Sequence, residues 1–239
     1  MDWDNFFLVH KGLEREGPGS PDDVIWTLEQ TGLRGELSVF DGGCGPGADL
    51  ETLAEALPEA RITGVDAQPQ FIEEAQARCA RFGDRVLARV GDMADPGGPH
   101  DLIWSAGALY FLGITEGLNL WRKALKPGGW VAFSEPVMLP GERTEPELAF
   151  WEEYPAITGL DGIRARVEAA GFSVADHRLI IGEPWAAYYG PMRERIAELR
   201  ADNPGTDLAA MLDLNEREAD LWQAASDRIA YALLLVRPA

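Results

Sequence analysis

Acidic residues placed after short apolar segments could hold a small ligand. Asp41 ends one such segment and opens the run Asp41-x-Gly43-x-Gly45-x-Gly47, and Asp66 ends the next segment. Glycines let a backbone approach a ligand without a β-carbon clash, and a helix that starts after them offers unpaired N–H groups. Asp66 is placed to accept hydrogen bonds from ribose hydroxyls. The spacing predicts a site for an adenosine-containing cofactor, and a glycine turn without a ligand is the alternative.

The elements that must position these residues alternate between strands and helices. Short apolar segments are typical of strands buried on both faces, and the segments between them repeat apolar residues at helical spacing. This alternation predicts an α/β fold, with a doubly wound, mostly parallel seven-stranded sheet. Long helices separate the final strands, which favours an antiparallel last strand. Strands are expected over residues 37–41, 61–66, 85–92, 101–107, 130–136, 173–182 and 228–236.

The charge of the first loop distinguishes between two cofactors. Gly43, Gly45 and Ala48 also satisfy the G-x-G-x-x-G/A spacing of a dinucleotide-binding turn, and both NAD and S-adenosylmethionine contain adenosine. A pyrophosphate would meet a like charge at Asp41, whereas the ammonium and sulfonium groups of S-adenosylmethionine are attracted to an acid. Asp92 could pair with the adenine amino group or simply cap a strand. S-adenosylmethionine is favoured, and an NAD(P)-dependent oxidoreductase remains the alternative.

Five segments together resemble the class I S-adenosylmethionine-dependent methyltransferases. They are "FDGGCGPG", "GVD", "GDM", "DLIWSAGALYFLG" and "LKPGGWVAFSE", and the resemblance spans residues 20–236 at the level of the fold. The segments "LEREGPGS" and "FWEEYPAI" are similar to those of small bacterial methyltransferases, most of which lack an assigned substrate. The resemblance implies cofactor contacts from Asp41, Gly43, Cys44, Gly45, Asp66, Ala67, Asp92, Met93, Ser105 and Ala106. Ala106 departs from the pattern, because relatives carry an acid there.

Methyl transfer requires little acid–base chemistry from the protein. The reaction is an in-line displacement, so positioning and exclusion of water dominate, and a base is needed only if the acceptor arrives protonated. Three residues are candidates for the acceptor side: Tyr110 after the fourth strand, Glu135 at the end of the fifth, and His10 in the N-terminal segment. Their structural alternatives are packing for Tyr110, a strand-end cap for Glu135 and an ordinary buried or exposed histidine for His10. His177, far along the chain, is a weaker candidate.

The chain is expected to form one domain, residues 1–239, with three functional regions. Residues 1–35 would form a helical lid, 36–136 the cofactor-binding core, and 137–239 the substrate-side helices and final strands. The lid hypothesis depends on the apolar N-terminal residues Trp3, Phe6 and Phe7, and a helix packed permanently on the core is the alternative. Aromatic residues of the C-terminal region could line an acceptor site for a small, partly apolar compound, cationic ones included. These are Trp151, Tyr154, Trp185, Tyr188 and Tyr189.

Composition narrows the partners. A formal net charge of −19 opposes binding to bulk nucleic acid or an anionic membrane, and the Asn/Asp-Pro-Pro-aromatic segment of nucleic-acid amino-methyltransferases is absent. Two cysteines form no disulfide framework, and no apolar run is long enough to span a bilayer. No histidine–carboxylate spacing indicates a metal. We therefore expect a cytoplasmic monomer or homodimer acting on a small-molecule acceptor; a non-catalytic S-adenosylmethionine-binding protein is a further alternative.

Overall fold

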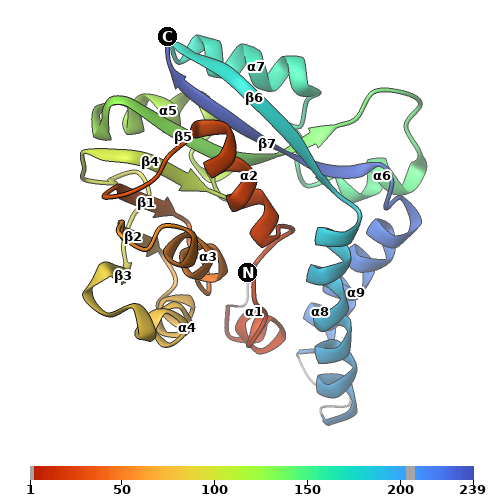
Figure 1. Ribbon diagram of the computed structural model, residues 1–239. Helices are drawn as coiled ribbons and strands as arrows, with labels where there is room; N and C mark the ends of the chain where they lie inside the picture. Colours follow the sequence, from red (N-terminus) through yellow and green to blue (C-terminus); the bar gives the residue numbers. More distant parts are fainter. Residues whose placement is uncertain (1–2, 203–207) are drawn as a thin grey trace.

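A seven-stranded sheet forms the centre of the molecule. The computed structural model describes residues 3–202 and 208–239. The strand order is β3-β2-β1-β4-β5-β7-β6, and β7 runs antiparallel to both of its neighbours, β5 and β6, while the pairs among the other strands are parallel (Figure 1). The predicted α/β fold with an antiparallel last strand is confirmed, and β7 lies between β5 and β6. The strands are β1 (Ser38–Gly42), β2 (Arg61–Asp66), β3 (Val86–Val90), β4 (His100–Ser105), β5 (Leu125–Met138), β6 (Phe172–Ile181) and β7 (Ile229–Pro238).

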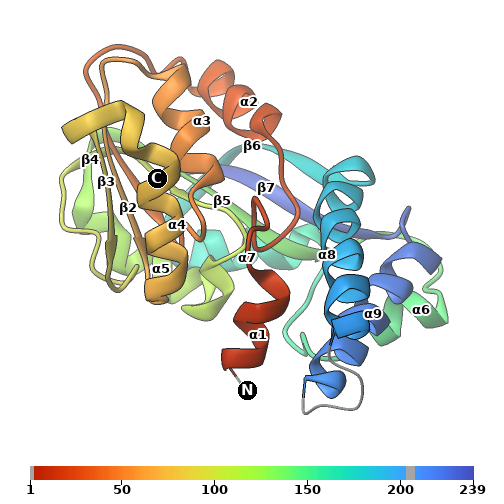
Figure 2. The same ribbon diagram turned by 90° about the horizontal axis from the view of Figure 1, so that it is seen from below.

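Helices cover both faces of the sheet and extend beyond it. Apolar residues of α2, α3 and α4 belong to one core cluster, whereas α5 and α7 pack into a second. Figures 1 and 2 show α8 and α9 side by side, extending away from the sheet, with α1 next to them. The helices are α1 (Trp3–His10), α2 (Pro21–Thr31), α3 (Ala48–Ala56), α4 (Pro69–Cys79), α5 (Ile114–Trp121), α6 (Glu145–Phe150), α7 (Leu160–Ala169), α8 (Glu183–Asp202) and α9 (Ala209–Ala224).

Local sequence signals explain where α2 begins and ends. The backbone N–H of Ser20 donates to the Asp23 carboxylate at 2.9 Å, and Pro21 occupies the first turn, where no N–H is needed. Gly32 ends the helix in the left-handed conformation, with φ of 67°. These contacts explain why the helix spans Pro21–Thr31.

The region between β5 and β6 contains two short helices. These are α6 and α7, separated by residues 151–159. Pro155 and Gly159 lie in that loop, and both residue types interrupt helices. The loop brings Tyr154 toward the sheet, where its ring contacts Trp151 and Tyr110. Within the described residues, no helix is both long and apolar enough to cross a membrane.

Candidate cofactor and acceptor site

The glycine loop after β1 is held tightly at the carboxyl edge of the sheet. Gly43, Gly45 and Gly47 all have positive φ, at 77°, 50° and 88°. The N–H of Gly43 donates to the Val65 carbonyl of β2 at 2.9 Å. A β-carbon on Gly43 would lie 2.4 Å from that of Ala108, so no side chain fits there. The loop after β1 therefore contacts the loop after β4 directly. Both loops lie at the carboxyl ends of parallel strands, which is where ligands bind in such sheets.

Asp66 connects β2 to this glycine loop. Its carboxylate accepts hydrogen bonds from the backbone N–H groups of Gly45 at 3.0 Å and Gln68 at 2.9 Å. Burial raises the pKa of Asp66, while its backbone hydrogen bonds act in the opposite direction. The side chain remains half-buried, so it is anchored without being enclosed. This is the position from which an acid at the end of β2 can contact a ribose diol.

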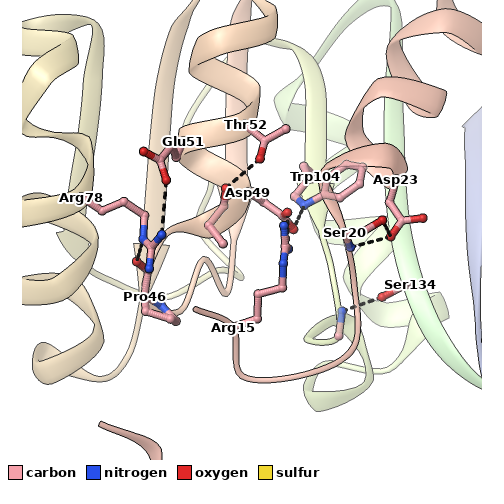
Figure 3. Close-up of polar contacts among 12 residues, drawn as sticks. Arg15, Ser20, Asp23, Pro46, Asp49, Glu51, Thr52, Arg78, Trp104 and Ser134 are labelled. Carbon is pink, nitrogen blue, oxygen red and sulfur yellow. Dashed lines mark hydrogen bonds and ion pairs between the residues drawn. The ribbon is translucent and has the colours of Figure 1, made fainter. Parts of the chain in front are cut away.

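A second group of carboxylates lies beneath the loop and surrounds Arg15. Figure 3 shows Arg15 reaching from the segment after α1 to Asp49 of α3, which it binds as an ion pair. Asp49 also accepts a hydrogen bond from Nε1 of Trp104 at 2.9 Å. Burial opposes the charged guanidinium, but Asp49 outweighs that effect and raises the pKa of Arg15. The charge of Asp49 is thus neutralised by a half-buried arginine from the N-terminal segment.

Asp41 has no such partner. Its side chain is 1% exposed, and its Oδ2 atom forms no hydrogen bond. Burial, together with the charges of Asp49 and Asp66, raises the pKa of Asp41 well above its usual range, although Arg15 acts in the opposite direction. A buried carboxylate oxygen without a partner is costly. The site is therefore electrostatically suited to a positively charged group.

The loop after β4 connects the glycine loop to the far half of the sheet. Ser105 at the end of β4 donates from Oγ to the Gly42 carbonyl at 2.7 Å. The N–H of Gly107 donates to Oγ of Ser134 on β5 at 2.8 Å. Ala106, at the position that departs from the family pattern, packs against the apolar core. Ser105 and Ala106 thus border the site, with Ser105 oriented toward the backbone of β1.

The remaining predicted cofactor residues differ in how far they are buried. Cys44 is buried, and burial raises the pKa of its thiol well above the usual range, so it packs below the loop. Ala67 is exposed beyond β2. Asp92 is exposed and accepts a hydrogen bond from the N–H of Ala94 at 2.8 Å, which matches the cap alternative; its adenine contact stays a prediction. The Met93 carbonyl accepts from Nε1 of Trp121 at 2.7 Å, next to Gly42.

The N-terminal segment packs against several elements. His10 is buried, with Nδ1 2.6 Å from Glu16 and Nε2 3.2 Å from Oδ1 of Asn215 on α9. Val9 and Leu13 belong to the apolar core. These contacts favour the alternative of a packed segment over that of an open lid. The side chain of Trp3, part of the predicted apolar pattern, lies outside the described residues.

Two residues beyond the sequence prediction come from the same segment. Arg15 and Glu16 lie in "LEREGPGS", a stretch singled out only for its resemblance to relatives. The Glu16 side chain lies close to Gly45, 3.6 Å from where a β-carbon on that glycine would be. Burial raises the pKa of Glu16, and His10 lowers it in part. Their positions next to the glycine loop arise only from tertiary packing.

Tyr110 and Glu135 both lie near the ends of central strands. Tyr110 is half-buried, and its ring centroid is 5.8 Å from that of Tyr154. Glu135 is 6% exposed, its Oε2 atom forms no hydrogen bond, and its Oε1 atom is 3.9 Å from Nη1 of Arg166. His177, in contrast, lies on the edge strand β6, 3.5 Å from Arg164. The structure therefore brings Tyr110 and Glu135 to the carboxyl side of the sheet.

The titration of Glu135 predicts how stability depends on pH. Burial raises the pKa of Glu135 from 4.5 to about 7, only partly opposed by Arg166. The folded state binds this proton more tightly than the unfolded chain does, so the bound proton stabilises the fold. This contribution is complete below pH 4.5 and is lost as the pH rises through about 7. We expect the melting temperature to fall between about pH 5 and about pH 8, and Glu135→Gln to flatten that dependence. Parallel profiles for the variant and the unmodified protein would contradict the assignment.

The chain is similar to known methyltransferases in sequence and in fold. A family model described as "Methyltransferase domain" matches residues 39–129. A trans-aconitate 2-methyltransferase from Streptomyces avermitilis is 36% identical over 123 residues, which cover 48% of this chain and 46% of that protein. A methyltransferase structure from Geobacter sulfurreducens, in complex with S-adenosylhomocysteine, has a TM-score of 0.86 at 20% identity, over 99% of this chain and 98% of that one. A second structure, a methyltransferase from Thiobacillus denitrificans in complex with S-adenosylhomocysteine, has a TM-score of 0.84 at 20% identity, over 98% of each chain. The chain thus carries a methyltransferase domain over residues 39–129, within the fold of the class I S-adenosylmethionine-dependent methyltransferases.

The sequence matches cover the two halves of the chain unequally. The chain spans about half the length of the first curated relatives that it matches, at 46% and 48%. The family model ends before most of β5. The sequence matches thus support the cofactor half of the chain most directly.

Proposed function

We propose that this chain binds S-adenosylmethionine at the carboxyl ends of β1, β2 and β4 and transfers its methyl group to a small-molecule acceptor. The observation that carries the proposal is the buried Asp41 carboxylate, whose Oδ2 atom has no partner next to the glycine loop. When bound, the cofactor supplies an electrophilic sulfonium methyl group. Its ammonium and sulfonium charges fit this acidic environment, whereas a dinucleotide pyrophosphate would be repelled.

The residues of the loop divide the binding roles among them. Asp66 would hold the ribose hydroxyls, because it is already fixed by two backbone hydrogen bonds and remains half-buried. The backbone of the glycine loop would lie close to the amino-acid portion, and Asp41 would attract its ammonium group. Asp92 and Met93 would border the adenine. Tyr110 and Glu135 would face the acceptor, and the packed N-terminal segment would help exclude water.

A titration with three ligands tests this proposal. We expect S-adenosylmethionine and S-adenosylhomocysteine to bind saturably in an isothermal titration calorimeter, and NADH to give no binding heat, because Asp41 opposes a pyrophosphate. Saturable NADH binding without a response to either adenosyl ligand would instead support the dinucleotide alternative. Trans-aconitate, the compound in the relatives' names, is an anion at neutral pH and can be titrated in the same instrument as a candidate acceptor.

A further inference from the structure

All five tyrosines of the chain meet in one continuous group of aromatic rings. Neighbouring ring centroids along it are 5.0–6.3 Å apart, which is normal for edge-to-face and offset aromatic contacts. We call this group the tyrosine cluster. In order of contact it consists of Tyr110, Tyr154, Trp151, Tyr231, Trp185, Tyr189 and Tyr188. Its members come from four separate parts of the chain: the loop after β4, the loop after α6, α8 and β7.

Part of the tyrosine cluster remains accessible to a ligand. The two tryptophans, Tyr189 and Tyr231 are buried, with exposed fractions of 6% or less, as expected of core residues. Tyr110, Tyr154 and Tyr188 are only half-buried. The group therefore has a packed base and an accessible side formed by three phenol rings.

A carboxylate lies at this accessible side. Glu218 of α9 accepts a hydrogen bond from the Tyr189 hydroxyl at 2.7 Å. Its side chain is exposed to solvent, yet crowding by protein atoms raises its pKa. Glu218 is therefore open to solvent and also bound to a buried member of the tyrosine cluster. His10 partly offsets this rise in the pKa of Glu218, whereas Glu153, the other charged neighbour, adds to it.

The charged groups around the cluster are predominantly acidic. Glu16, Glu135, Glu153 and Glu218 all raise the pKa of one or more of its phenols. Arginines of α8 whose contacts are known bind elsewhere: Arg193 to Asp220, Arg195 to the Leu8 carbonyl and Glu198, and Arg200 to Asp213 and Glu216. Arg166 pairs with Glu135 and donates a hydrogen bond to the Thr158 hydroxyl. An anionic acceptor would find carboxylates at this surface.

The loop after β4 links the cluster to the cofactor loop. Ala108 lies against Gly43, and the next residue but one is Tyr110. On the other side of the loop, a β-carbon on Gly107 would lie 3.5 Å from the Tyr231 ring. The tyrosine cluster is thus adjacent to the site proposed above for the cofactor, where a methyl acceptor must lie.

We propose that the tyrosine cluster and Glu218 recognise a small ammonium compound, so that the acceptor is an amine. Aromatic faces attract cations, and a carboxylate adds direct charge pairing. This inference rests on the proposed methyltransferase function. A protonated amine would first pass a proton to a carboxylate. The lone pair freed on nitrogen would then form the N–C bond to the methyl group while the S–C bond breaks, and the electron pair of the S–C bond would stay on sulfur.

Choline and its uncharged isostere 3,3-dimethylbutan-1-ol provide a direct binding test. Each is titrated into the full chain saturated with S-adenosylhomocysteine, with trans-aconitate as the anionic comparison. We expect choline to bind at least about tenfold more tightly than the isostere, since a desolvated cation–π contact and a carboxylate both favour the charge. Equal affinity for the two, no binding of either, or preferential binding of trans-aconitate overturns the inference.

Matched variants locate the effect. Glu218→Gln keeps a hydrogen-bond acceptor for Tyr189 and should weaken choline binding at least about tenfold, whereas Glu216→Gln on the same helix should leave it unchanged. Tyr154→Phe keeps the ring and should retain affinity, while Tyr154→Leu should lose it. An unchanged choline affinity in Glu218→Gln contradicts the role of the carboxylate. If S-adenosylhomocysteine itself fails to bind, the proposed function falls and the inference with it; if it binds and choline does not, only the inference falls.

Discussion

Replacing Asp66 with alanine is expected to weaken binding of S-adenosylhomocysteine by about 10- to 150-fold. A hydrogen bond to a charged group contributes about 1.5–3 kcal/mol, and that range converts to this loss in affinity. The carboxylate already accepts from the N–H groups of Gly45 and Gln68, so its oxygens are preoriented for ribose hydroxyls. The substitution also frees the Gly45 end of the glycine loop, which acts in the same direction.

The matched control for this experiment is Asp84→Ala. Asp84 is an exposed acid between α4 and β3, so its removal changes the net charge equally without touching the loop. We expect the control to bind S-adenosylhomocysteine like the unmodified protein in calorimetry. Both variants should remain folded, because Asp66 lies at a strand end. An Asp66→Ala protein with undiminished affinity would show that Asp66 is only a loop anchor and that the ribose partner lies elsewhere.

Replacing Arg15 with methionine is expected to destabilise the fold by about 3–5 kcal/mol, the typical cost of removing one partner of a buried ion pair. For a chain of this size, that corresponds to a drop in melting temperature of roughly 6–20 °C. Arg15 is 17% exposed and Asp49 is 9% exposed, so little water is available to replace the guanidinium. Without it, Asp49 and Asp41 would face each other as buried carboxylates, with Asp66 close by.

Arg81→Met is the matched control for Arg15→Met. Arg81 also pairs with two carboxylates, those of Glu51 and Glu55, but its side chain is 55% exposed. Exposed ion pairs are screened by water, so we expect little change in its melting temperature. Thermal unfolding of both variants followed by circular dichroism makes the comparison. Equal, small shifts for the two arginines would mean that Arg15 is not required to neutralise the buried acids.

A lower pH should reduce the loss caused by Arg15→Met. The pKa of Asp41 is already raised by burial and by Asp49 and Asp66, so protonation becomes easier once the guanidinium is gone. A protonated carboxyl no longer repels its neighbours. The difference in melting temperature between the variant and the unmodified chain should therefore shrink as pH falls, a dependence that a purely steric defect would not show.

The sequence by itself determined the cofactor half of this protein. The alternation of strands and helices predicted the sheet, and the spacing of Asp41, Gly43, Gly45 and Asp66 predicted a loop at its carboxyl edge. These features were readable because their causes are local: positive φ requires glycine, buried strands require short apolar runs, and helix ends require particular caps.

Only the tertiary structure decided the surroundings of the site. The pairing of Arg15 with Asp49, the orphaned oxygen of Asp41 and the position of Glu218 join residues that are distant in the chain. Tyr154 and Tyr231 meet in the same cluster because the loop over residues 151–159 and the antiparallel β7 bring them there. Such contacts depend on how whole elements pack, and packing leaves no fixed spacing in the sequence from which it can be read.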